Sequence, residues 1–170
     1  MTGDALWYEA AQVVGITNAL NVAADTLGAL GAVDEAAASV ETRALFAEIR
    51  AFYGSADVPQ SFRFIAHDPL YAADVWAAAK HAFADNRLTR RFKEALAFAV
   101  SVSTRSTSGA AWHLTQMRRV GVGPRGVMEI VGVTQMFSSY TKIADMLQLE
   151  PDMGNIAPPD PSPAPGGPSR

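Results

Sequence analysis

The sequence predicts an all-α helical bundle, and three features of the chain support that fold class. Alanine, leucine and valine supply most of the aliphatic residues, which favours helices over sheets. Glycine and proline residues divide the chain into helix-length segments. No stretch alternates apolar and polar residues between hairpin turns, as a half-buried strand does. At 170 residues, the chain is long enough for one domain but too short for two.

The first three predicted helices are set by their end signals. The first covers about residues 5–27. A second begins after Ser39, an N-cap candidate, and stops at Gly54, a C-terminal cap candidate. A short helix follows Pro59.

The next two helices have clear starts. Asp68 and Pro69 combine an N-cap with proline at the first helical position, and this helix is expected to reach about Ala84. Thr89 caps the following helix. Its segment 95–102 is nearly apolar all round, so we expect it in the middle of the bundle.

Two further helices, over about residues 108–120 and 124–149, complete a single helical domain over residues 1–150. The last twenty residues, 151–170, hold seven of the ten prolines and almost nothing that fills a core. They predict a disordered, proline-rich tail.

The charge pattern gives no sign of a nucleic-acid or membrane partner. The net charge is −3, with 14 basic and 17 acidic residues, and the one dense basic cluster, at residues 90–93, is too small for phosphate binding. The longest uncharged N-terminal run, residues 10–24, is below the roughly 20 residues of a membrane span. Asp4 and Glu9 stand where a signal peptide has basic residues, so we expect a cytoplasmic protein.

The chain has no cysteine. This excludes disulfides, thiolate metal sites and thiol catalysis. His67 and His81 are isolated and predict no metal site, and no motif predicts a cofactor.

Glu94 and His113 are the candidate catalytic residues, each with an alternative interpretation. Glu94 opens an apolar helix, where it either pairs with a cation or simply favours the helix dipole and points outward. His113 lies on the apolar face of its helix, where a histidine is more often a hydrogen-bonded core residue. An imidazole nevertheless titrates near neutrality, which makes it the best proton-transfer group in this chain.

Ser106, Gly109 and Met117 are the residues expected to line a substrate pocket beside His113. Glycine inside a helix costs roughly 1 kcal/mol against alanine, so Gly109 marks either close approach or open space. Ser106 is seven residues from His113, about 10.5 Å along a helix, so it is not expected to be a nucleophile. Either Ser106 or Ser108 is interpreted as the N-cap of this helix.

The segment 92–149 resembles the core of the alkylhydroperoxidase D and carboxymuconolactone decarboxylase superfamily, and the similarity extends over about residues 40–150. In that layout a glutamate opens a buried helix, a CxxC follows twelve residues on, and a histidine stands four residues after the second cysteine. The glutamate falls on Glu94 and the histidine on His113. The cysteines fall on Ser106 and Gly109, and Ser108 takes the place of a histidine sometimes found between them.

The resemblance implies an oligomeric alkylhydroperoxidase D-like bundle that keeps the family's proton-relay positions without its thiols. Thiol peroxidase activity is excluded on chemical grounds. Glu94 and His113 are expected to face the space that the sulfur pair would have filled.

Two functions follow from this expectation. The first is a cofactor-independent decarboxylase, isomerase or lyase acting on a small organic acid or lactone, with His113 as general acid or base and Glu94 orienting it. The alternative is a non-catalytic helical subunit or small-molecule binding protein, in which the two residues satisfy each other. A solvent-connected cavity reaching both side chains favours the enzyme, and a sealed helix contact favours the structural role.

The apolar faces of the first and last helices exceed what one small bundle can bury, and so predict a homo-oligomer, as a dimer, trimer or hexamer. These two helices also resemble each other, between residues 13–27 and 130–147. The likeness has two explanations, an ancient duplication or simply two amphipathic helices of similar composition.

Overall fold

The structure, a computed structural model, describes residues 3–149, and all of its regular elements are helical. The expected tail, residues 151–170, lies outside the described residues. The helices are α1 (Gly3–Thr26), α2 (Val40–Tyr53), α3 (Gln60–Ile65), α4 (Pro69–Phe83), α5 (Arg90–Ser103), α6 (Thr107–Arg119) and α7 (Pro124–Leu147), with a short 3₁₀ helix, η1 (Leu27–Leu30), after α1.

The predicted caps are confirmed. Ser39 accepts a hydrogen bond from the Thr42 amide, and Thr89 accepts one from the Phe92 amide. Asp68 accepts from two amides of the first turn of α4. Gly54 ends α2 in the left-handed region at φ 59°, which a side chain with a Cβ disfavours.

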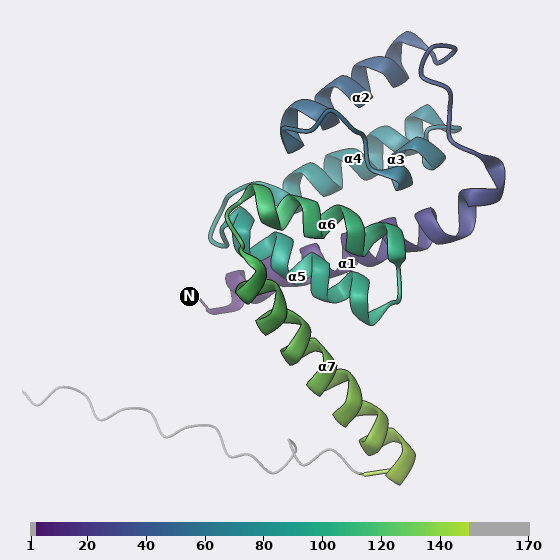
Figure 1. Ribbon diagram of the computed structural model, residues 1–170. Coiled ribbons are helices and arrows are strands. Elements are labelled where there is room, and N and C mark those ends of the chain that lie inside the picture. Colours follow the sequence, from purple (N-terminus) through teal and green to yellow (C-terminus); the bar gives the residue numbers. More distant parts are fainter. Residues whose placement is uncertain (1–2, 150–170) are drawn as a thin grey trace, which may run out of the picture.

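The helices form two packed groups joined by α1 (Figure 1). Helices α2, α3 and α4 form the upper part of the view, and α5 and α6 pack against each other in the lower part. Helix α1 contacts both groups. The largest cluster of buried apolar side chains lies between α1, α2, α3 and α4 and includes Phe46, Ile49, Phe62 and Trp76.

Helix α5 is central but not fully covered. It contacts α1, α4, α6 and α7, as its apolar sequence predicts. In the segment 95–102, however, Ala97, Phe98 and Ser101 are buried, whereas Val102 is 36% exposed. The reason is that α7 covers only part of this helix before it projects away from the body (Figure 1).

By length and composition, one helical segment among the described residues could cross a membrane, Ala5–Leu30. This differs from the sequence expectation, which counted only the uncharged run 10–24. In the fold, Val13, Thr17 and Leu20 of this segment are buried against other helices. Only 22% of its most apolar stretch is buried, however, so this segment is not a fully covered core helix. The absence of a membrane partner therefore stays a prediction.

Candidate functional site

Glu94 and His113 meet inside the molecule, on adjacent helices. Glu94 lies one turn into α5, and His113 lies two turns into α6. The His113 Nδ1 and Glu94 Oε2 atoms are 2.8 Å apart. Glu94 has no exposed surface, and His113 is 4% exposed. The structure therefore brings together the two residues that the sequence nominated.

Arg90 completes this cluster from the preceding turn of α5. Its Nε donates to Glu94 Oε1 at 2.6 Å, so the two carboxylate oxygens are divided between a guanidinium and an imidazole. The guanidinium also lies over the rings of Phe52 and Tyr53, at 4.7 and 4.8 Å from their centroids. A cation held against aromatic faces and paired with a carboxylate is fixed in position.

Aromatic side chains hold the His113 ring and enclose the cluster. The Phe83 ring stacks on the imidazole, with centroids 5.6 Å apart and planes within 13°. Trp112 meets Tyr53 edge to face, with centroids 5.2 Å apart. Stacking on one side and the Glu94 bond on the other leave His113 with one orientation. Its second ring nitrogen, Nε2, has no hydrogen-bond partner among residues 3–149.

Part of the space expected at the missing thiols is filled by α1. A Cβ on Gly109 would collide with Asn21 Oδ1 and lie 2.7 Å from Ser101 Oγ, so on this side the glycine marks close approach. Asn21 Nδ2 donates to Ser101 Oγ at 3.2 Å and to Thr104 Oγ1 at 3.1 Å. Helix α1 therefore occupies the side of Gly109 that a Cβ would enter, although Gly109 also lines a small cavity beside His113.

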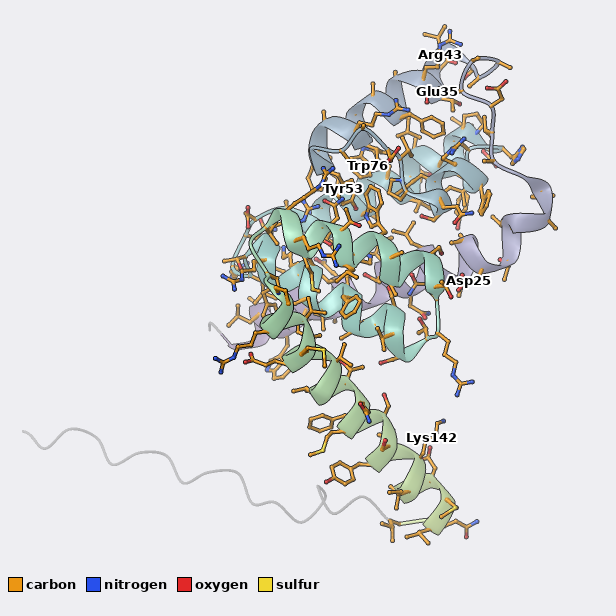
Figure 2. All side chains as sticks on the ribbon, viewed as in Figure 1. Asp25, Glu35, Arg43, Tyr53, Trp76 and Lys142 are labelled. Carbon is orange, nitrogen blue, oxygen red and sulfur yellow. The ribbon has the colours of Figure 1, made fainter. Side chains whose placement is uncertain are left out.

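Of the two N-cap candidates, Ser106 and Ser108, the structure selects Ser106. Its hydroxyl accepts from the Gly109 amide at 3.3 Å and donates to Asp25 Oδ1 at 3.2 Å. Figure 2 labels Asp25 at the end of α1 that lies beside the α5–α6 turn. At both positions where the family layout has cysteine, a polar side chain of α1 is in contact: Asp25 bonds to Ser106, and Asn21 packs against Gly109.

A small cavity does lie next to His113, on the side of α6 that faces α2 and α3. Its volume is about 30 Å³, and its lining includes Asn21, Tyr53, Ser61, Gly109, Trp112 and His113. This is room for one or two water-sized groups. Glu94, Ser106 and Met117 are not among the residues that line it. Met117 packs instead with Phe98 and Val122 in a separate apolar cluster.

The sequence analysis did not identify Tyr53 and Ser61 as site residues. Tyr53 ends α2 and Ser61 begins α3, sixty and fifty-two residues before His113. No local pattern signals such a distant meeting. The contact of Arg90 with Glu94 could have been predicted, because the two residues are four apart, which is the spacing of an ion pair on one helix.

No group of three histidine or carboxylate side chains in the described part of the chain could hold a metal ion. The arrangement provides one oriented imidazole next to a polar cavity of very limited volume. Glu94 bonds to the imidazole on the side away from the cavity, and Arg90 neutralises the charge of Glu94.

Comparison with solved structures defines the fold. The chain is similar to the alkylhydroperoxidase AhpD core from Rhodospirillum rubrum, with 24% sequence identity and a TM-score of 0.62. The match covers 67% of this chain and 85% of that one. The bundle therefore has the AhpD-like fold.

Residues 69–149 match the model of the carboxymuconolactone decarboxylase family. The matched segment runs from α4 to α7. Most of the site, Arg90, Glu94 and His113, lies inside this segment, whereas Asn21, Tyr53 and Ser61 lie before it. No curated protein sequence matches the chain.

Proposed function

We propose that this chain is a cofactor-independent acid/base enzyme, a decarboxylase, isomerase or lyase acting on a small organic acid or lactone. His113 transfers the proton through Nε2, and Glu94 fixes the tautomer of the ring through Nδ1. A positioned histidine of this kind contributes about 10² to 10⁴ in rate.

One observation carries this proposal. The Nδ1 atom of His113 is bound to Glu94, and the same buried side chain lines a cavity. A ring held in this way presents its other nitrogen to whatever enters the cavity. Glu94 is fully buried and outside the lining, so its role is to position His113 rather than to touch a substrate.

The experiment uses a substitution that keeps the Glu94 contact. His113→Asn places an amide near the Nδ1 position and removes Nε2. In a panel of small lactones and organic acids followed by NMR, we expect the native chain to convert at least one compound. We expect His113→Asn to lower that rate at least about 10²-fold and to leave the melting temperature nearly unchanged. Histidine 81, which is exposed on α4, provides the matched control His81→Asn.

The alternative is a non-catalytic helical subunit or small-molecule binding protein, and a specific observation favours it. The cavity holds only about 30 Å³, it does not reach Glu94, and the cysteine positions are closed by Asn21 and Ser106. In that case His113→Asn lowers thermal stability and changes no turnover. Unchanged conversion in the variant would reject the catalytic assignment.

We further propose that the chain works as a homo-oligomer. Helix α7 has no buried residue along its 24 positions, and its apolar side chains need a partner surface. The cytoplasmic location and the absence of a cofactor, a metal or a nucleic-acid partner stay predictions from the sequence.

A further inference from the structure

Three buried side chains around the small cavity each carry a polar atom that no protein group satisfies. They are Tyr53 and Ser61, each 6% exposed, and His113, 4% exposed. Tyr53 Oη, Ser61 Oγ and His113 Nε2 have no hydrogen-bond partner within residues 3–149. Polar atoms on largely buried side chains are normally hydrogen-bonded, either to protein or to water, so these three atoms take a partner from the cavity.

These three atoms are not sealed in the core. Across the described residues, the side-chain atoms that lack both a hydrogen bond and any contact with solvent are Thr17 Oγ1, Trp76 Nε1 and Gln116 Nε2. Tyr53 Oη, Ser61 Oγ and His113 Nε2 are absent from that set, so each still reaches solvent-accessible space. Since all three side chains line the same cavity, a small group inside it is the natural partner for them.

From this arrangement we infer that Tyr53 and Ser61 are ligand-binding residues, whose hydroxyls hold an uncharged carbonyl oxygen in the cavity opposite His113. The inference rests on the proposed function for the role of His113 and adds two contacts from α2 and α3. A cavity of about 30 Å³ admits one such functional group, and the remainder of a larger ligand would lie outside it.

The Tyr53 hydroxyl is suited to donate. Burial raises the pKa of Tyr53 well above its usual range, the charge of Glu94 raises it further, and Arg90 opposes this only in part. The phenol therefore keeps its proton across the working pH range and acts as a hydrogen-bond donor. Its orientation is fixed by edge-to-face contacts with Phe52 and Trp112.

The same electrostatics favour an uncharged ligand group. Burial and the Glu94 carboxylate both disfavour a negative charge on the tyrosine oxygen, although Arg90 opposes them, and burial also disfavours an ionised carboxylate inside this small cavity. A neutral carbonyl oxygen accepts the hydrogen bonds without this penalty. The innermost group of the ligand is therefore a ketone, ester or amide type of oxygen, and an ionised carboxylate of the same compound would lie outside the cavity.

Formamide and formate test this selection, because they have the same number of heavy atoms and differ in charge. The full chain is titrated with each, at matched ionic strength, and the ring signals of His113 and the indole N–H of Trp112 are followed by NMR. Three heavy atoms support a Kd of roughly 1 mM at best. We expect saturable shifts at both residues with formamide and weaker binding of formate.

Tyr53→Phe and Ser61→Ala each remove one hydroxyl without breaking any protein hydrogen bond. We expect each to weaken formamide binding about fivefold, with an unchanged melting temperature. Tyr71→Phe, on the exposed face of α4, is the matched control and should bind as the native chain does.

No saturable binding of formamide to the native chain, equal binding by Tyr53→Phe, or formate binding as tight as formamide would each overturn the inference. The titration measures binding without turnover. A chain that binds formamide through Tyr53 and converts no compound would refute the proposed enzyme and leave this inference standing.

Discussion

Glu9 and Lys93 form a second buried ion pair, away from His113, that ties α1 to α5. The Lys93 Nζ and Glu9 Oε1 atoms are 2.6 Å apart, and their side chains are 0% and 7% exposed. Glu9 also accepts from the Arg87 and Leu88 amides, each at 3.2 Å. Buried charges are retained only when they are paired in this way.

We predict that Glu9→Gln lowers the free energy of unfolding by about 3 to 5 kcal/mol at neutral pH, because it leaves Lys93 buried without its counter-ion. Urea denaturation measures this change. Adding Lys93→Met should restore most of the loss. Glu48→Gln breaks the exposed pair with Lys80 and should cost no more than about 1 kcal/mol. Equal costs for the two single variants would contradict this account.

The same pair predicts a pH dependence. Burial alone would raise the pKa of Glu9, but hydrogen bonds from Lys93 and the Leu88 and Arg87 amides hold that pKa below its ordinary value of 4.5. A lowered carboxyl pKa stabilises the folded state above the unfolded value and loses this contribution as the pH falls through the folded value. The stability difference between the native chain and Glu9→Gln should therefore shrink as the pH is lowered below 4.5. A difference that stays constant down to the acid transition would contradict the assignment.

At the scale of the element, helix α1 determines which side chains occupy the positions of the family's two cysteines. Asn21 and Asp25 reach the turn between α5 and α6, where the family layout places its two cysteines. Ser101, Thr104 and Ser106 supply the matching hydroxyls. This part of α1 precedes the segment matched by the family model, so the closure of the thiol positions comes from outside that segment.

We predict that Gly109→Ala destabilises the fold by about 1 to 3 kcal/mol, the usual cost of overpacking. The new Cβ would collide with Asn21 Oδ1 and displace the side chain that bonds to Ser101 and Thr104. Gly132→Ala is the matched control, since a Cβ there meets nothing within 4 Å in the middle of α7. It should be neutral or stabilising by up to about 1 kcal/mol. Thermal denaturation measures both, and equal melting temperatures would show that the α1 contact is loose.

In the molecule as a whole, one long helix, α7, is largely exposed to solvent. Six apolar side chains of α7, each between 47% and 67% exposed, recur every three or four residues: Val133, Met136, Phe137, Tyr140, Ile143 and Leu147. They form a stripe about 21 Å long on a helix that projects from the body. Figure 2 labels Lys142 on this same projecting part of the helix.

We predict that this α7 stripe mediates the proposed homo-oligomer. Sedimentation equilibrium of the native chain should give a mass above the 18.1 kDa of the monomer. Tyr140→Glu should shift the chain toward the monomer, because it places a charge in the centre of the contact. Leu70→Glu introduces the same charge at an apolar residue on α4 that is 82% exposed, and should have no effect. A native chain that stays monomeric at high concentration would refute the prediction.

The helices and their ends were predictable because their signals are local. Ser39, Asp68, Thr89 and Ser106 each bond to an amide two or three residues away, so the cap and its helix can be read from one short stretch. The pairing of Glu94 with His113 came from the family layout and not from the local pattern, which also allowed both to be ordinary core or surface residues.

The sequence by itself determined an all-α fold, the absence of thiol chemistry and the similarity of residues 69–149 to the carboxymuconolactone decarboxylase family. Only the tertiary structure decided that Asn21 fills the space at Gly109, and that Tyr53 and Ser61 join His113 around a cavity. The physical reason is the separation along the chain of the residues on which each property depends. Helix propensity, capping and the lack of sulfur are properties of neighbouring residues or of composition, whereas a cavity exists only where helices distant in the chain fail to fill the space between them.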